Sequence, residues 1–90
     1  MVTAFVLINA DEAKPEQTAA RLLTFDGVTE VHIVAGEYDM VATLRVADNR
    51  DLLGVITERI LHTDGVERTK TLIALQTHSR IDLDKVFEGV

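Results

Sequence analysis

RLLTFDGV (residues 21–28) returns 38 residues later as RILHTDGV (residues 59–66), and this pair of stretches decides the fold. Each copy reads as a helix end, a turn and a strand start, because apolar residues and arginine precede Asp-Gly and a valine follows. The glycine supplies the left-handed residue that ends a helix at little steric cost. Two copies in one short chain indicate two related halves of a single domain, since a solenoid requires about three repeats.

An apolar, β-branched run precedes each copy. The first run covers Val2–Ile8 and the second covers Met40–Val46. Such runs predict strands, so each half reads strand, helix, strand. Two halves joined through Gly36–Asp39 predict an α+β, ferredoxin-like βαββαβ plait, in which a four-stranded antiparallel sheet carries two helices on one face.

The first helix is predicted over about residues 12–25. Pro15 fits its first turn, where the missing N–H costs no helical hydrogen bond. Helical spacing gives this helix an apolar stripe. The stripe comprises Ala19, Leu22 and Leu23.

The second helix is predicted to start after Asp48, whose side chain can cap it. Asp51 adds a negative charge that the positive end of the helix dipole favours. Gly54 weakens the helix slightly. The apolar residues predicted to share one face are Leu52, Leu53, Ile56 and Ile60.

The sheet face away from the helices is predicted to be apolar. Phe5 and Leu7 point to it from the first strand, and the last strand runs through residues 72–75 without polar alternation. In the second strand the helix-facing set is predicted as Val31, Ile33 and Ala35, and the opposite set as Glu30, His32 and Val34. A bare face of this kind is larger than monomers usually expose, so a second copy's sheet or the chain's own tail is expected to cover it. A symmetric homodimer is the favoured arrangement.

Composition narrows the class of protein. The 90 residues carry a net charge of −6, which opposes direct binding of nucleic acid, and no apolar run approaches the roughly 20 residues that cross a membrane. The N-terminus lacks the basic region of a signal peptide, so a cytoplasmic location is expected. No cysteine is present, which excludes disulfides and thiolate chemistry.

Gly36-Glu37-Tyr38-Asp39 connects the second and third strands. Glycine and aspartate are ordinary turn residues, so this segment can be a plain hairpin, with Glu37 exposed to solvent. It can also bind an amino acid: Asp39 can accept from the ammonium group, and N–H groups near Gly36 can hold the carboxylate. The Tyr38 ring can pack on aliphatic atoms of such a ligand.

Thr69 and Thr71 stand two residues apart near the start of the last strand, so their side chains share a face. That pattern suits a ligand-lining role, and it equally suits the β-propensity of threonine.

The plait, the Gly36–Asp39 hairpin and the run Arg68-Thr69-Lys70-Thr71 resemble the effector-binding domain of the Lrp/AsnC (feast/famine) regulators, also called the RAM domain. In that family a glycine with an aspartate three positions later marks the hairpin, and R-T-x-T opens the last strand. The resemblance covers about residues 1–77. It implies a non-enzymatic sensor of a small effector, usually an amino acid, that acts in the transcriptional regulation of amino acid metabolism.

The resemblance also implies an assembly. Sheet-to-sheet homodimers would associate further into octamers or decamers, with the effector in clefts lined by Gly36, Tyr38, Asp39, Thr69 and Thr71. No cofactor is expected. Full-length members carry a DNA-binding helix-turn-helix before this domain, and this chain begins at the first strand. It is therefore expected to be a stand-alone member that assists full-length Lrp/AsnC regulators.

A different function stays open from the residues: a small dimeric α/β-barrel enzyme of the cofactor-free oxygenase or isomerase type. His32 would be its candidate base, although no orienting carboxylate follows from spacing. A large pocket around His32 within one subunit would favour the enzyme. His62 is predicted to complement the helix dipole, and the spacing of the histidines does not suggest a metal site.

Residues 78–90 form a C-terminal extension with four apolar residues among charges. It is expected either to cap its own domain or to reach a neighbouring subunit. The apolar residues are Ile81, Leu83, Val86 and Phe87.

Overall fold

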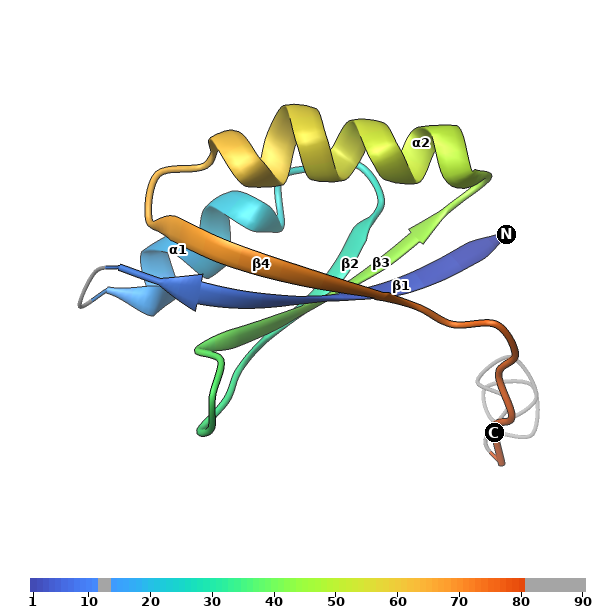
Figure 1. The fold of residues 1–90 in the computed structure, drawn as a ribbon, viewed down its shortest axis with the longest axis horizontal. Helices are drawn as coiled ribbons and strands as arrows, with labels where there is room; N and C mark the ends of the chain where they lie inside the picture. Colours follow the sequence, from blue (N-terminus) through green and yellow to red (C-terminus); the bar gives the residue numbers. More distant parts are fainter. Residues whose placement is uncertain (12–13, 81–90) are drawn as a thin grey trace, which may run out of the picture.

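Four strands form one sheet, and the helical segments cover one of its faces (Figure 1). The structure is a computed structural model that describes residues 1–11 and 14–80. The strands are β1 (Val2–Ala10), β2 (Val28–Ile33), β3 (Met40–Val46) and β4 (Val66–Ile73). The helical segments are α1 (Pro15–Leu22), α2 (Asn49–Gly54), a π-helical turn η1 (Val55–Arg59) and a 3₁₀ turn η2 (Ile60–His62).

The sheet has the order β2-β3-β1-β4, and every neighbouring pair is antiparallel. This order, with two helices on one face, confirms the predicted ferredoxin-like plait. β3 has the predicted bounds, and β1 runs two residues further than predicted. Ile8 stands between Met40 of β3 and Thr69 of β4, which fixes the register in the middle of the sheet.

The two repeated Asp-Gly pairs follow the helical segments and lead into the next strands as predicted, although α1 ends at Leu22 and not near residue 25. Gly27 and Gly65 have φ values of 94° and 95°, in the left-handed region, and β2 and β4 begin at the valine that follows each. A Cβ on Gly27 would lie 2.8 Å from Val46 Cγ1. Each turn therefore needs glycine both for its backbone angle and for space.

α1 corrects one prediction about the core. The helix ends at Leu22, where the N–H of Leu23 still donates to the carbonyl of Ala19. Leu22 is fully buried, whereas Leu23 is 49% exposed and does not belong to the apolar stripe. One helical residue rotates the side chain by about 100°, so only one of two adjacent leucines can face the sheet. Thr18, one turn earlier, is buried instead.

α2 begins as predicted. The Asp48 carboxylate accepts a hydrogen bond from the N–H of Asp51 at 2.9 Å, which confirms the cap. Leu52 and Ile60 are buried, whereas Leu53 is 61% exposed, so its assignment to the core face was wrong for the same geometric reason as in α1.

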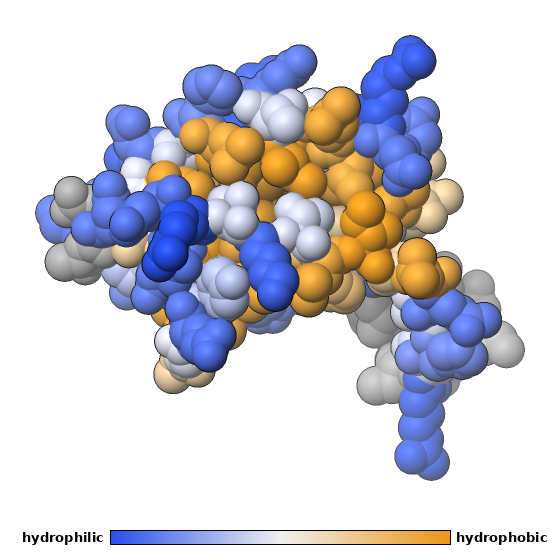
Figure 2. Space-filling view, in the orientation of Figure 1, coloured by the Kyte–Doolittle hydropathy of each residue, from blue (hydrophilic) through white to orange (hydrophobic). Residues whose placement is uncertain are grey.

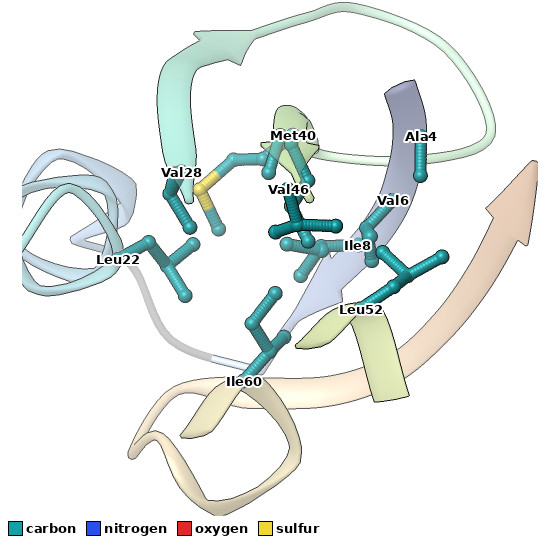
Figure 3. Close-up of a cluster of buried hydrophobic side chains, with 11 residues drawn as sticks. Ala4, Val6, Ile8, Leu22, Val28, Met40, Val46, Leu52 and Ile60 are labelled. Atoms are coloured by element: carbon teal, nitrogen blue, oxygen red, sulfur yellow. The ribbon is translucent and has the colours of Figure 1, made fainter. Parts of the chain in front are cut away.

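The core lies between the helices and the inner side of β1 and β3 (Figure 3). Alternate residues of both strands point into it, because successive strand residues face opposite sides. The fully buried side chains from the strands are Ala4, Val6, Ile8, Met40, Ala42 and Leu44. Leu22, Leu52 and Ile60 meet them from the helical side.

The opposite face of the sheet carries exposed apolar side chains, as predicted. Phe5 pairs with Leu72 in register, and their exposed fractions are 36% and 46%. Hydrophobic surface also continues from α2 to the C-terminal part of β4, where Ile73 is half-exposed (Figure 2). The described chain therefore leaves apolar area in contact with solvent on the sheet face and along β4.

The second strand follows its predicted facing only in part. Val31 pairs with Ala42 and packs against the core, as expected of a helix-facing residue. Ile33 pairs with the buried Met40 and yet is 51% exposed, at the end of an edge strand. Ala35 lies beyond the end of β2 and is exposed. The register therefore places Val31 and Ile33 on the predicted helix-facing side, and of these two only Val31 packs against the core.

Candidate functional site

The β2–β3 hairpin folds back onto the end of β1. The N–H of Val34 donates to the carbonyl of Asp39 at 3.0 Å and closes the turn. The N–H of Asp39 donates to the carbonyl of Ile8 at 2.9 Å, which joins the hairpin to the middle of the sheet. The turn is thus fixed at both sides.

Two side chains lock the hairpin to β1. Asp39 Oδ2 accepts a hydrogen bond from the N–H of Ala10 at 2.8 Å. Asn9 Nδ2 donates to the carbonyl of Glu37 at 2.9 Å. One carboxylate oxygen of Asp39 therefore holds the backbone, a structural role that is separate from its predicted contact with a ligand.

A recess of about 280 Å³ opens beside the hairpin. We call it the hairpin recess, and it is lined by Asn9, Glu37, Tyr38, Arg68 and Thr69. Tyr38 is half-buried, and both charged side chains are exposed. The recess thus combines a guanidinium, a carboxylate and an aromatic ring at one end of the sheet.

The predicted site residues divide into two groups. Tyr38 and Thr69 line the hairpin recess together, whereas Gly36, Asp39 and Thr71 lie outside its lining. Thr69 and Thr71 share a face, as predicted, but they pair in register with Ile8 and Val6 and so belong to the helix-facing side.

Three lining residues were not among the predicted ligand contacts. Arg68 belongs to the R-T-x-T run and pairs in register with Asn9 across β1 and β4. That pairing depends on contacts between strands far apart in sequence, so spacing alone did not reveal it. Glu37 is exposed, as predicted, and still borders the recess.

The histidines lie away from the recess. His32 Nε2 stands 3.7 Å from Glu30 Oε2, and both side chains are more than half exposed. His32 lines neither the hairpin recess nor the larger hollows near α2. His62 Nδ1 lies 3.0 Å from the carbonyl of Thr57, at the C-terminal end of the helical segment, as predicted.

Residues 1–11 and 14–80 contain no group of three His, Asp or Glu side chains arranged to hold a metal ion. Within the same residues, no helix has the length and hydrophobicity needed to cross a membrane.

The sequence from residue 3 to residue 82 matches the family model of the Lrp/AsnC ligand binding domain. The chain belongs to the Lrp/AsnC family. The match covers both halves of the plait, the hairpin and the R-T-x-T run.

Relatives of this Lrp/AsnC domain include transcriptional regulators. It is 31% identical over 77 residues to the HTH-type transcriptional regulator FL11 of Pyrococcus furiosus, covering 86% of this chain and 50% of FL11. The chain spans about half the length of the curated relatives it matches.

Solved structures show the same fold. TTHA0845 from Thermus thermophilus is 40% identical, with a TM-score of 0.82 over 89% of this chain and 100% of that one. A feast or famine regulatory protein from M. tuberculosis, complexed with L-methionine, is 34% identical, with a TM-score of 0.75 over 91% of this chain and 56% of that one.

Proposed function

We propose that this Lrp/AsnC domain binds an amino acid at the hairpin recess and thereby acts as the effector-sensing part of a transcriptional regulatory assembly in the cytoplasm. The observation that carries the proposal is the lining of the recess. A free amino acid has one negative and one positive group, and the recess offers one side chain of each opposite charge. Its volume of about 280 Å³ lies just below the roughly 300–1,000 Å³ of most ligand pockets.

Each lining residue has a role in this proposal. The guanidinium of Arg68 binds the ligand carboxylate, because its planar N–H groups match two carboxylate oxygens. Glu37 accepts from the ammonium group. The ring of Tyr38 packs on the aliphatic part of the ligand. Thr69 adds a hydroxyl that can donate or accept.

A neighbouring subunit completes the site. Pockets usually bury most of a small ligand, whereas Arg68 and Glu37 are exposed in the single chain. Gly36, Asp39 and Thr71 lie near the recess in sequence but outside its lining, and they are the residues we assign to a cleft shared between dimers.

The apolar sheet face supports the dimer. Phe5 and Leu72 are exposed on the side away from the helices, where a second sheet would bury them. We propose that these dimers assemble further into octamers or decamers, to which full-length Lrp/AsnC regulators can contribute. Mass measurement in solution, with and without amino acids, tests the assembly, and a monomer under both conditions contradicts it.

The relatives support both the ligand class and the setting. The 34% identical M. tuberculosis protein was crystallised with L-methionine, and FL11 is a transcriptional regulator. Both relatives favour a regulatory domain over the alternative hypothesis of an oxygenase or isomerase. His32, the residue on which the enzyme hypothesis relied, is exposed beside Glu30 and away from the hollows.

Calorimetric titration of the assembled protein with each of the twenty amino acids tests the binding function. At least one should bind, and Arg68→Gln should weaken that binding about tenfold or more, as expected for loss of a charge-assisted bidentate contact. Arg80→Gln is the matched control, because Arg80 is exposed and outside the recess. Absence of binding by all twenty contradicts the proposal.

Two substitutions at Asp39 separate its structural and binding roles. Asp39→Ala removes the acceptor for Ala10 and should cost about 1 kcal/mol of unfolding free energy, with the chain still folded. Asp39→Asn keeps a side-chain oxygen for that bond and removes the charge. If the carboxylate contacts the ammonium group, both variants bind more weakly. Unchanged affinity in Asp39→Asn removes the charge of Asp39 from the site.

A further inference from the structure

A larger hollow of about 680 Å³ lies at the other end of β3 from the hairpin. Figure 1 shows these two ends of β3, one joined to the hairpin and the other leading into α2. The walls are the α1–β2 turn, the end of β3, α2 and η1. It shares no lining residue with the hairpin recess. We call it the arginine hollow.

Three guanidiniums from separate elements line the arginine hollow: Arg45 from β3, Arg50 from α2 and Arg59 from η1. Three carboxylates line it as well. Within residues 1–11 and 14–80, none of these arginines has a carboxylate oxygen within 4.0 Å of its nitrogens. The guanidinium donors at the hollow therefore remain available for an anion from outside the chain.

The hollow also has an apolar wall. Phe25 from the α1–β2 turn and Val55 from η1 are half-buried members of the core periphery. Val46, at the end of β3, is 8% exposed. A ligand that suits the whole hollow therefore carries an apolar body next to its anionic group.

Gly54 gives an independent indication that something approaches this wall. Glycine is a poor residue for a helix interior, yet Gly54 has helical angles, with φ −60° and ψ −46°, and the helical segment continues past it. A Cβ on Gly54 would meet nothing within 4 Å, although the residue lines the hollow. By contrast, Gly27 on the facing turn has a steric reason within the chain, which is Val46. The bare backbone at Gly54 is the feature expected where a ligand lies close to the helix.

The helix changes its winding directly after Gly54. The hydroxyl of Thr57 donates to the carbonyl of Leu53 at 2.7 Å, a side-chain bond that commonly distorts helices. Residues 55–59 then form a π-helical turn. Such turns are rare in proteins, and those that occur are often found at functional sites. This turn contributes Glu58 and Arg59 to the hollow.

We propose that the arginine hollow is a second binding site, for a small organic anion in which a carboxylate or phosphate adjoins an apolar or ring-shaped body. Arg45, Arg50 and Arg59 bind the anionic group. The body of the ligand lies against Phe25 and the open backbone at Gly54. The carboxylates around the hollow disfavour ligands with several negative charges.

Amide chemical shifts of the labelled, assembled chain locate the binding. The probes are phenylacetate, adenosine 5′-monophosphate and inorganic phosphate. Phenylacetate or the nucleotide should shift Gly27, Gly54 and Val55 in a saturable way. Phosphate, which lacks an apolar body, should bind at least about tenfold more weakly. The proposal is overturned if neither organic probe shifts these amides at ~10 mM, because a specific site has a dissociation constant well below that concentration.

Gly54→Leu is the decisive variant. Leucine favours helix, so the fold should persist, and its side chain should enter the hollow and abolish binding of the organic probe. Arg50→Gln should weaken binding about tenfold, and Arg80→Gln should leave it unchanged. Amino acid binding at the hairpin recess, measured by calorimetry, should survive Gly54→Leu, which separates this site from the first. Equal affinity of the organic probe for Gly54→Leu and the unaltered chain overturns the proposal.

Discussion

The two copies of the repeat have the same structure at the helix end and the glycine turn, but the helix that precedes this end differs between them. Leu22 and Ile60 occupy equivalent positions and are both fully buried, and Leu23 and Leu61 are both 49% exposed. The two glycines differ by 1° in φ. Yet the first copy follows a regular α-helix, whereas the second follows a π-helical and a 3₁₀ turn.

This difference shows which part of the repeat the fold requires. The buried aliphatic residue and the glycine set the helix end and the start of the next strand, and both copies keep them. The winding before that point is free to vary. In the first copy Arg21 donates to the carbonyl of Asp64 at 3.2 Å and so joins the two turns. The equivalent Arg59 instead lines the arginine hollow.

The largest expected effect comes from the equivalent core positions. Leu22→Ala and Ile60→Ala should each lower the unfolding free energy by about 2–5 kcal/mol, because each removes a fully buried side chain and leaves a cavity. Denaturant titration of the assembled protein measures this. Leu23→Ala and Leu61→Ala are matched controls and should cost less than about 1 kcal/mol. A large cost in one copy and a small cost in the other would break the equivalence.

The repeat, the strands and the cap of α2 could be predicted because they depend on neighbours in sequence. Met40–Val46 and the Asp48 cap need only local patterns. The choice between adjacent leucines could not, since it depends on how each helix is rotated against the sheet. Leu22 with Leu23 and Leu52 with Leu53 are the examples.

The candidate site, like the fold, was predictable where it depends on local sequence and not where it depends on contacts between distant segments. Tyr38 and Thr69 follow from turn chemistry and from the family motif, and they line the hairpin recess. Asn9 and Arg68 join it through strand register, and the bond from Ala10 to Asp39 spans 29 residues. The arginine hollow draws its residues from segments that no single motif contains.

The glycines of the two turns should show an intermediate effect. Gly27→Ala and Gly65→Ala should each lower the unfolding free energy by roughly 1–3 kcal/mol, because alanine is strained at the observed φ and its Cβ has no space. At Gly65 the Cβ would lie 2.5 Å from the Oγ1 of Thr18, which is buried in α1.

A double variant separates the two causes at Gly65. Thr18→Ala removes the obstructing hydroxyl, so the Gly65→Ala substitution should cost less in that background than in the unaltered chain. The loss of unfolding free energy that remains is due to the backbone angle. It should be similar to the part of the Gly27→Ala loss that is not due to the contact of the new Cβ with Val46. Equal costs of Gly65→Ala in both backgrounds would mean that Thr18 does not limit the turn.

The smallest effect concerns how the two helices begin. α2 has the Asp48 side-chain cap, whereas Lys14 at the start of α1 makes no such bond. Asp48→Ala should therefore cost about 1 kcal/mol, measured by denaturant titration, whereas Lys14→Ala should change stability by less than about 0.5 kcal/mol. Lys14→Ser gives α1 the cap that α2 already has, and a gain of a few tenths of a kcal/mol up to about 1 kcal/mol is expected. If Lys14→Ser instead destabilises the chain as much as Asp48→Ala does, the start of α1 depends on the lysine itself, and the two halves differ at their helix starts for a reason other than capping.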